Sequence, residues 1–350
     1  MGSKFVIYGG GRRSNHQNRI GVSENRRVAE SNNLPVEKWY KGNIHTHTNA
    51  GGPRIGYPNG DPGADSDPAT VTAWYRRHNY DFLVLTDHNH RTLLEYAAGR
   101  RRFRKPLMIP GEEVSLRIHN ETIAVHLGAI GVNRMVEPVD AADVVATLQA
   151  NVDAIREAGG IAAINHPNLT WAFDHNHISQ VKGASLLEVF NGHPLVNVYG
   201  VGGRPGYEKI WDKVLSSGLA IWGVAVDDSH QFKGEFGRQK SNPGRGWVVV
   251  KATALDEESI LEGLQSGQFY SSTGVHLESL DSGPDGMSLR IAPDGDALYT
   301  TRFVGRGGLT LKEVFGTEAV FRAGGDEGYF RATVSSSTGA QAWTQPVFAT

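Results

Sequence analysis

The chain has 350 residues, of which 39% are hydrophobic, and its formal net charge is −2 at pH 7. This length favours one large domain with a smaller unit beside it, and the near-zero charge gives no strong signal for nucleic acid or a membrane surface. Cysteine is absent. Disulfides and thiolate metal sites are therefore excluded, and any metal must be held by imidazole and carboxylate groups.

Residues 1–39 form a polar N-terminal extension rich in Arg, Asn and Gly. The run from Gly9 to Arg13 lacks the Lys-Ser/Thr ending and the following helix of a phosphate-binding loop. Residues 1–11 contain no long apolar core, so no signal peptide is seen. No stretch approaches the ~18 consecutive apolar residues of a membrane span. We therefore expect a cytoplasmic protein.

From residue 40 to about 275, short apolar runs alternate with helical patterns. Helices are expected over 68–79, 140–158, 207–217 and 257–266. Asp67 is a suitable N-cap for the first, with Pro68 in its first turn, and Gly159 ends the second. Alternation of strands and helices at this period predicts a parallel sheet or a barrel.

The pattern changes over residues 276–350. Short runs of strand-forming residues, such as 287–291, 319–322 and 329–334, lie between turns rich in Gly, Asp and Ser. This spacing predicts a small antiparallel β unit.

Six segments carry metal-type ligands, and five of them follow short apolar runs expected to be buried strands. They are His45-Thr46-His47, Thr86-Asp87-His88, Glu112-Glu113, His126, Asn165-His166-Pro167 and Asp228-Ser229-His230. Side chains alternate along a strand, so His45 and His47 point the same way, as do Asp228 and His230. In a barrel of parallel strands these ends meet at one rim, which predicts a multinuclear metal site. The alternative to a metal site is a rim of polar groups that hydrogen-bond only to one another. Such a rim would bury many polar atoms at a cost in free energy and without a function.

Several motifs resemble the polymerase and histidinol phosphatase (PHP) superfamily. They are His-Thr-His-Thr from 45, Leu-Thr-Asp-His-Asn from 85, Pro-Gly-Glu-Glu-Val-Ser from 110, Asn-His-Pro-Asn from 165 and Asp-Asp-Ser-His from 227. The segments 74–80, 191–194, 242–247 and 342–346 resemble the carbaryl-hydrolase-like branch of that superfamily. The resemblance covers about 40–350. It implies an α/β fold, a distorted seven-stranded (β/α) barrel over 40–275 that holds two or three divalent ions. The small C-terminal β unit would follow it.

The resemblance also implies a role for each ligand. One metal would be held by His45, His47, Glu113 and Asp228. Glu113 would bridge to a second metal held by His126 and His166, and His88 and His230 would hold a third with a further acid. The family's spacings select Glu113 over Glu112 and Asp228 over Asp227. Glu112 is expected to face solvent or to support a ligand, and Asp87 could orient a ligand imidazole.

The further acid is the least defined ligand. In the family it usually follows the His-x-His pair within several residues, but here a Gly/Pro-rich insertion over 49–64 intervenes. Asp65 is the candidate, with Asp61 and Asp67 as rivals. The insertion is either a mobile loop beside the metal site or an ordinary surface loop without a role in it.

Clustered divalent metals activate water and polarise an electrophilic centre. The leading hypothesis is a metal-dependent phosphoesterase acting on a small, anionic substrate, with Mn, Fe or Zn as the metal. The alternative is a hydrolase of carbamate, carboxylic ester or amide bonds. A non-catalytic metal-binding module is a minor alternative, because a structural site needs far fewer ligands. The sequence indicates no oligomeric state.

Two residues are candidates for the chemistry around the metals. His193 could be a general acid for the leaving group or a hydrogen-bond donor to a ligand. Arg245, between two glycines, could bind phosphate. It belongs to a basic stretch after the last ligand pair that could equally be a solvated loop, made of Lys233, Arg238, Lys240 and Arg245.

Overall fold

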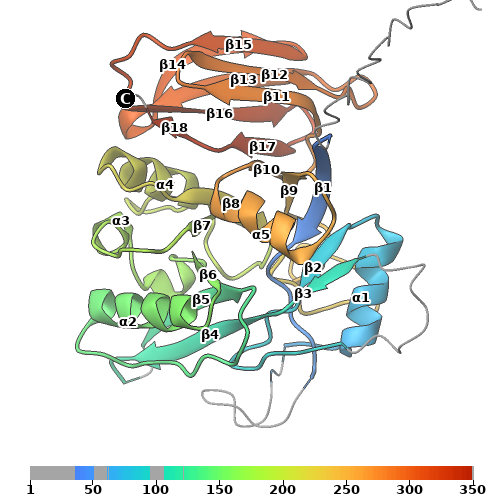
Figure 1. Cartoon of the computed structure of the whole chain (residues 1–350), viewed down its shortest axis with the longest axis vertical. Helices are drawn as coiled ribbons and strands as arrows, with labels where there is room; N and C mark the ends of the chain where they lie inside the picture. The colour runs from blue at the N-terminus through green and yellow to red at the C-terminus, as the bar shows by residue number, and fades with distance from the viewer. Residues whose placement is uncertain (1–35, 51–60, 62, 95–105, 121, 349–350) are drawn as a thin grey trace, which may run out of the picture. The chain divides into compact units, whose positions relative to one another are not determined.

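The computed structural model describes residues 36–50, 61, 63–94, 106–120 and 122–348 (Figure 1). Every element below belongs to the compact unit Glu37–Thr350. The expected N-terminal extension lies outside the described residues as far as 35, and a strand already begins at Lys38. In the part of the chain that the structure describes, none of the helices has the length and apolar character needed to cross a bilayer.

The protein is a mixed α/β protein with many strands and few helices. Its largest sheet has ten strands in the order β14-β13-β16-β17-β10-β9-β1-β2-β3, with β18 paired to β16. Their bounds are β1 Lys38–Asn43, β2 Phe82–Val84, β3 Leu107–Ile109, β9 Trp247–Ala252, β10 Phe269–Ser272, β13 Tyr299–Gly305, β14 Leu309–Phe315, β16 Tyr329–Ser336, β17 Gln341–Thr344 and β18 Val347–Phe348.

A second sheet runs β4-β5-β6-β7-β8, and a third runs β11-β12-β15. The second contains β4 Gly111–Ile118, β5 Ile123–Ile130, β6 Ile161–Ile164, β7 Leu186–Asn191 and β8 Trp222–Val226. The third contains β11 Leu277–Gly283, β12 Gly286–Ile291 and β15 Glu318–Arg322. One apolar cluster contains residues of β2, β6, β8 and β9, among them Val84, Ala163, Val224 and Val250, so it packs the ten-stranded sheet against the five-stranded one.

The structure does not show the clear seven-stranded (β/α) barrel that was predicted. Only β1-β2-β3 and β6-β7-β8 are parallel, whereas β4 and β6 both pair antiparallel with β5. A short turn joins β4 to β5, and such a connection can only place two strands antiparallel. Pro110, between β3 and β4, has no amide hydrogen with which to extend a ladder.

Single backbone contacts join the two sheets beyond their regular ladders. Isolated parallel bridges link Thr46 with Ser229 and His88 with Glu113. The amide of Asp228 donates to the carbonyl of His45, and the amide of Glu113 donates to the carbonyl of Asp87. The chain therefore leaves regular structure at the segments that carry six of the predicted ligands, whereas Glu113 and His126 lie within β4 and β5.

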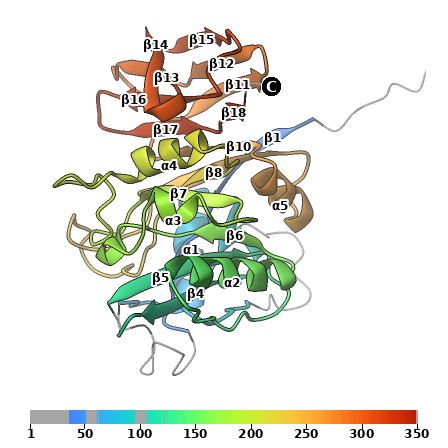
Figure 2. The same ribbon diagram turned by 90° about the vertical axis from the view of Figure 1, so that its left-hand side faces the viewer.

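The four predicted helices are confirmed, with shifted ends. They are α1 Pro68–Arg77, α2 Val144–Glu157, α4 Tyr207–Ser216 and α5 Glu257–Gln265. The second starts later than expected because the Asp143 side chain caps it by accepting the amide of Ala146. A short helix, α3 His175–Ile178, and two 3-10 turns, Leu169–Trp171 and Arg306–Gly308, were not predicted. Helix α2 lies against the five-stranded sheet, where Val152 and Ile155 share a core with Leu127 (Figure 2).

The strands after residue 276 are antiparallel, as expected. Strands β13, β14, β16, β17 and β18 continue the larger sheet, because β17 pairs with β10, whereas β11, β12 and β15 form the separate three-stranded sheet. A buried ionic cluster also ties them to α4. The Arg331 side chain, which is fully buried, donates to Asp212 from Nε (2.9 Å) and Nη2 (2.7 Å) and to Glu208 from Nη2 (3.0 Å). Tyr329 donates its hydroxyl to the same Asp212 oxygen at 3.0 Å.

Replacing Arg331 by Met should lower the free energy of unfolding by about 3–5 kcal/mol, because Asp212 would stay buried without its cation. Adding Asp212→Leu should recover much of this loss. Urea unfolding at fixed metal concentration measures both variants. The control is Arg290→Gln, which breaks the exposed pair with Glu318 and should cost less than about 1 kcal/mol. Equal losses for Arg331→Met and Arg290→Gln would contradict a role for the buried cluster.

Candidate metal centre

The structure brings eight of the nine predicted metal ligands together. They are His45, His47, His88, Glu113, His126, His166, Asp228 and His230. All eight are buried, the most exposed being His230 at 8%. Six of them lie just beyond strand ends, as expected, in the segments after β1, β2, β6 and β8.

Glu113 and His126 reach the centre from within strands rather than from strand ends. Glu113 is the third residue of β4, and His126 lies in the middle of β5. Side chains alternate along β4, so Glu113 and Ser115 face the centre while Glu112 faces the opposite side. Glu112 is fully buried there and accepts the amide hydrogen of Val136 at 2.7 Å. The expectation that it faces solvent or supports a ligand was therefore wrong.

Glu113 is the hub of the centre. Its Oε1 lies 3.0 Å from His166 Nε2, 3.3 Å from His45 Nε2 and 3.4 Å from His126 Nδ1. Its Oε2 lies 2.7 Å from His88 Nδ1 and 3.7 Å from His47 Nε2. One carboxylate is thus surrounded by imidazoles from the segments after β1, β2 and β6 and from β5. This placement is suited to a ligand shared between ions.

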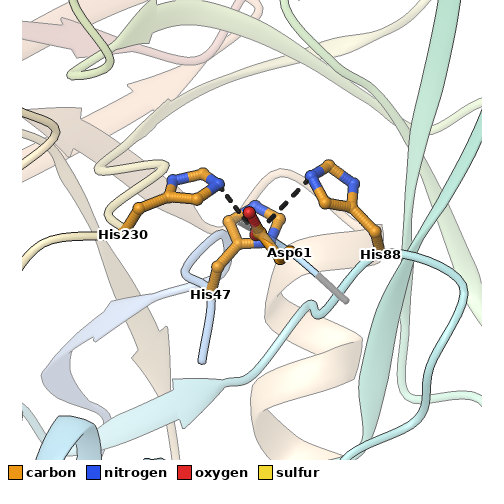
Figure 3. A group of neighbouring side chains, drawn as sticks. All are labelled: His47, Asp61, His88 and His230. Atoms are coloured by element: carbon orange, nitrogen blue, oxygen red, sulfur yellow. Dashed lines mark ion pairs between the residues drawn. The ribbon is translucent and has the colours of Figure 1, made fainter. Parts of the chain in front are cut away.

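Two further carboxylates complete the arrangement. Asp228 Oδ1 lies 3.2 Å from His47 Nε2, 3.4 Å from His45 Nε2 and 3.7 Å from His230 Nδ1. Asp61 Oδ2 lies 3.1 Å from His230 Nε2, 3.7 Å from His47 Nδ1 and 3.8 Å from His88 Nε2. Figure 3 shows Asp61 among these three rings.

Asp61, and not Asp65, is the acid that joins His88 and His230, which corrects the sequence prediction. The Asp65 carboxylate accepts the amide hydrogens of Phe232 (3.0 Å) and Lys233 (3.1 Å). Asp67, the other rival, caps α1 by accepting the amide of Thr70 at 2.9 Å. Spacing alone could not select among the three, because the path of the insertion decides which carboxylate returns to the histidines. Most of that insertion, 51–60 and 62, lies outside the described residues.

Burial and mutual attraction set the charge states of the centre. Burial raises the pKa of Glu113 and of Asp228, but His45 and other imidazoles outweigh it and hold both pKa values well below the usual range. Burial, together with His230 and His88, lowers the pKa of His47 to about 3. Burial also lowers the pKa of His126, to about 4. Charged carboxylates and neutral imidazoles such as these are the forms that bind metal ions. For His45, His166 and His230 the neighbouring carboxylates outweigh burial and raise the pKa, that of His230 to about 9, so these rings would release a proton when an ion binds.

The unpaired polar atoms show that these residues fit divalent cations. Four buried atoms of the centre have no hydrogen-bond partner: His47 Nδ1, Asp61 Oδ2, Glu113 Oε2 and His126 Nδ1. Some lie within ion-pair distance of a neighbour but lack hydrogen-bond alignment, as Glu113 Oε2 does beside His88. Unpaired buried polar atoms are costly. Divalent cations coordinated by nitrogen and oxygen would satisfy all four.

Glu188 supports the centre and was missed by the sequence analysis. It is 1% exposed, and its Oε1 lies 2.7 Å from His45 Nδ1. Its Oε2 accepts the backbone amide of His166 (2.7 Å) and the side-chain amide of Asn191 (2.9 Å). A carboxylate in this position fixes the orientation of a ligand imidazole. The sequence gives one indication of a functional role for Glu188, because it is a single acid within the otherwise apolar run Leu186–Phe190.

Two aspartates, Asp87 and Asp227, neighbour metal ligands in the sequence and hydrogen-bond to the loops around the centre. Asp87, expected to orient an imidazole, accepts the amide (2.6 Å) and hydroxyl (2.7 Å) of Thr48 and the hydroxyl of Thr92. Asp227 faces away from the centre, as predicted. It accepts the amides of residues 244–246 and the hydroxyl of Tyr75. Both carboxylates therefore fix the backbone beside a ligand.

The two candidate residues for chemistry lie next to the centre. The His193 ring is 5.4 Å from the His230 ring, and its Nδ1 accepts the amide of Leu195 at 3.2 Å. The Arg245 guanidinium donates to the carbonyls of Gly192 (2.6 Å) and Gly237 (2.7 Å). Arg245 is thus already anchored by backbone oxygens, with further N–H groups still available.

No protein-family model matches the chain, and no curated protein matches it. Among solved structures, a two-domain protein from Bacteroides vulgatus contains a predicted PHP-like metal-dependent phosphoesterase. It is 16% identical with a TM-score of 0.45, and the match covers 85% of this chain and 90% of that one. A candidate metal-dependent phosphoesterase from Bifidobacterium adolescentis is 13% identical with a TM-score of 0.34, over 57% of this chain and 89% of its own. Both similarities are distant.

Glu113→Gln should lower the metal content by at least one ion per chain, because an amide cannot replace a charged carboxylate shared by several imidazole-bound ions. Glu112→Gln is the matched control. It faces the opposite side of β4, burial raises its pKa to about 7, and a glutamine can still accept the amide of Val136. Elemental analysis after metal reconstitution measures both. A larger loss from Glu112→Gln would show that the assignment of the two faces is wrong.

Asp61→Asn should remove at most one ion, because Asp61 approaches only His47, His88 and His230. Asp65→Asn should leave the metal content unchanged, because Asp65 belongs to none of the ligand groups. It loses one of the two amide hydrogen bonds, since the amides of Phe232 and Lys233 bind different oxygens of the carboxylate. The same elemental analysis separates the two variants. Loss of every ion from Asp61→Asn, or of one ion from Asp65→Asn, would contradict this arrangement.

Proposed function

We propose that this protein is a metal-dependent hydrolase of the PHP superfamily that cleaves phosphoesters of small molecules. The observation that carries the proposal is the packing of five imidazoles around Glu113, with Asp228 and Asp61 alongside. This ligand set suits two or three divalent ions, and Mn, Fe and Zn all accept it. A purely structural metal site uses far fewer ligands, which disfavours a non-catalytic module.

Divalent ions bound there would lower the pKa of a coordinated water and polarise the oxygens of a phosphoryl group. The protein's own groups prepare the site for this chemistry. Glu113 and Asp228 keep negative charge at neutral pH, and Glu188 holds the His45 ring in place. Bulk water has little access to these side chains, so charges act on each other more strongly than they would in solvent.

His193 is proposed to stabilise the leaving oxygen by a hydrogen bond. Because its Nδ1 accepts the Leu195 amide, the neutral ring carries its hydrogen on Nε2. When water attacks the phosphorus and the bond from phosphorus to the leaving oxygen breaks, this N–H can donate a hydrogen bond to that oxygen as it gains negative charge, and the attacking water supplies the proton that the released alcohol carries. Removing one donor of this kind typically costs about 10²–10³-fold in kcat.

The alternative is hydrolysis of carbamate, carboxylic ester or amide bonds, as the motifs of the carbaryl-hydrolase-like branch suggest. One observation favours it. Arg245, the residue expected to bind phosphate, already donates to two backbone carbonyls, which is a structural role that a neutral substrate would not disturb. The same activated water can attack a carbonyl carbon.

A hydrolysis panel on metal-reconstituted protein tests the proposed function. Aryl phosphomonoesters, phosphodiesters and nucleotides should include substrates that release phosphate or an alcohol, and chelation should abolish turnover. His193→Phe, which removes the donor, should lower kcat by about 10²-fold on phosphoesters with poor leaving groups and far less on 4-nitrophenyl phosphate, whose leaving oxygen needs little stabilisation. Turnover confined to neutral esters or carbamates would replace the phosphoesterase with the alternative.

A further inference from the structure

A cavity of about 920 Å³ lies beside the metal centre. Its walls come from the end of β7, the loop that leads to α4 and the loop over 236–245. Four aromatic side chains line it, those of Trp171, Phe190, Tyr199 and Phe236. A cavity with this lining favours a flat, apolar group, because aromatic rings stack on such groups and shield them from water.

The cavity adjoins the metal centre. Asn191 lines it and donates its side-chain amide to Asp228 Oδ2 at 3.1 Å. His193 also lines it, while its ring lies 5.4 Å from the His230 ring. A substrate with its scissile group at the metals would therefore pass His193 and place its leaving group among the aromatic rings.

The charged side chains that line the cavity are positive. Arg238 and Arg245 both face the cavity, and no carboxylate lines it within the described part of the chain. The guanidinium of Arg245 is fixed by the carbonyls of Gly192 and Gly237, which orients its remaining N–H groups. Oriented guanidinium groups bind planar carboxylates and phosphates well.

The backbone that carries Trp171 is strained. Thr170 and Trp171 both adopt left-handed conformations, with φ of 53° and 56°. This region is unfavourable for residues with a branched or bulky side chain, and two in succession are uncommon. The Arg204 guanidinium also lies 5.4 Å from the centre of the Trp171 ring. Strain of this kind concentrates at ligand-binding sites.

We propose that this cavity binds the leaving group of the substrate, and that this group is an aromatic alcohol with a second acidic substituent. The proposal rests on the phosphoesterase function and names its substrate class. Water would supply the new oxygen on phosphorus and the proton that the aryl oxygen finally carries, the bond from phosphorus to the aryl oxygen would break, and His193 Nε2 would donate a hydrogen bond to that oxygen as it leaves. The rings would hold the aryl group, and Arg238 with Arg245 would hold its acid.

Kinetics on three phosphomonoesters test the proposal: 4-carboxyphenyl phosphate, phenyl phosphate and an alkyl phosphate. The wild-type protein should prefer the carboxylated ester over phenyl phosphate by about tenfold in kcat/KM, the size of one charge-assisted hydrogen bond. Arg238→Gln should abolish this preference. Trp171→Leu should lower kcat/KM for both aryl esters by about tenfold and leave the alkyl ester unchanged. The exposed Arg290→Gln is the matched control and should change none of these values, and all variants should keep full metal content.

Binding of 4-hydroxybenzoate, the expected product, separates this proposal from the proposed function. Calorimetry should show binding to metal-loaded protein, weakened about tenfold by Arg238→Gln and by Trp171→Leu. Product binding with this dependence, in a protein that cleaves no phosphoester, would support the cavity and overturn the phosphoesterase. Phosphoester turnover with no preference among leaving groups and no product binding would overturn the cavity proposal and leave the function intact.

Discussion

The structure depends on a single constraint, which is that nine ionisable side chains share one volume from which water is almost excluded. Removing charges from water is expensive unless each has a partner. Glu113 meets this requirement for several imidazoles at once, and Asp228 and Asp61 meet it for the rings that Glu113 reaches less closely. Four unpaired atoms face this same volume, which are His47 Nδ1, Asp61 Oδ2, Glu113 Oε2 and His126 Nδ1. Bound cations would remove the cost of leaving these four without partners.

Six of the ligands lie at the junction of two sheets, where regular pairing ends, and Glu113 and His126 face the same junction from within β4 and β5. Within a ladder, backbone groups are used by neighbouring strands and side chains follow the pleat. At the junction, Asp228 and Glu113 still make backbone hydrogen bonds, but to the ends of β1 and β2 rather than along a strand. Asp228 and His166 also take positive φ values, 48° and 21°. Irregular backbone lets side chains of neighbouring segments converge on one point, and the two packed sheets hold that point in place.

Most of the correct predictions came from local sequence patterns. The helices were readable from capping residues and spacing, and the ligand segments from the residues that follow apolar runs. Pairing between distant strands was not readable, so the antiparallel turn at β4 and β5 was missed, together with the strand-internal positions of Glu113 and His126. Asp61 and Glu188 show the same limit. An acid in a long insertion, or a single acid in a buried strand, gains its role only from what the rest of the fold places next to it.

The position of β1 bears on how the protein acquires its metal. The His45 and His47 pair follows this strand directly. The strand itself is held between β2 and β9, and β9 comes from residues near 250. During synthesis the first two ligands therefore leave the ribosome long before the strand that fixes them. Pairing of this kind joins distant parts of a chain and forms slowly. An early ion would meet a pair of flexible imidazoles with modest affinity, so the nascent chain could release a mismatched metal. Tight capture would come only once the C-terminal half has folded.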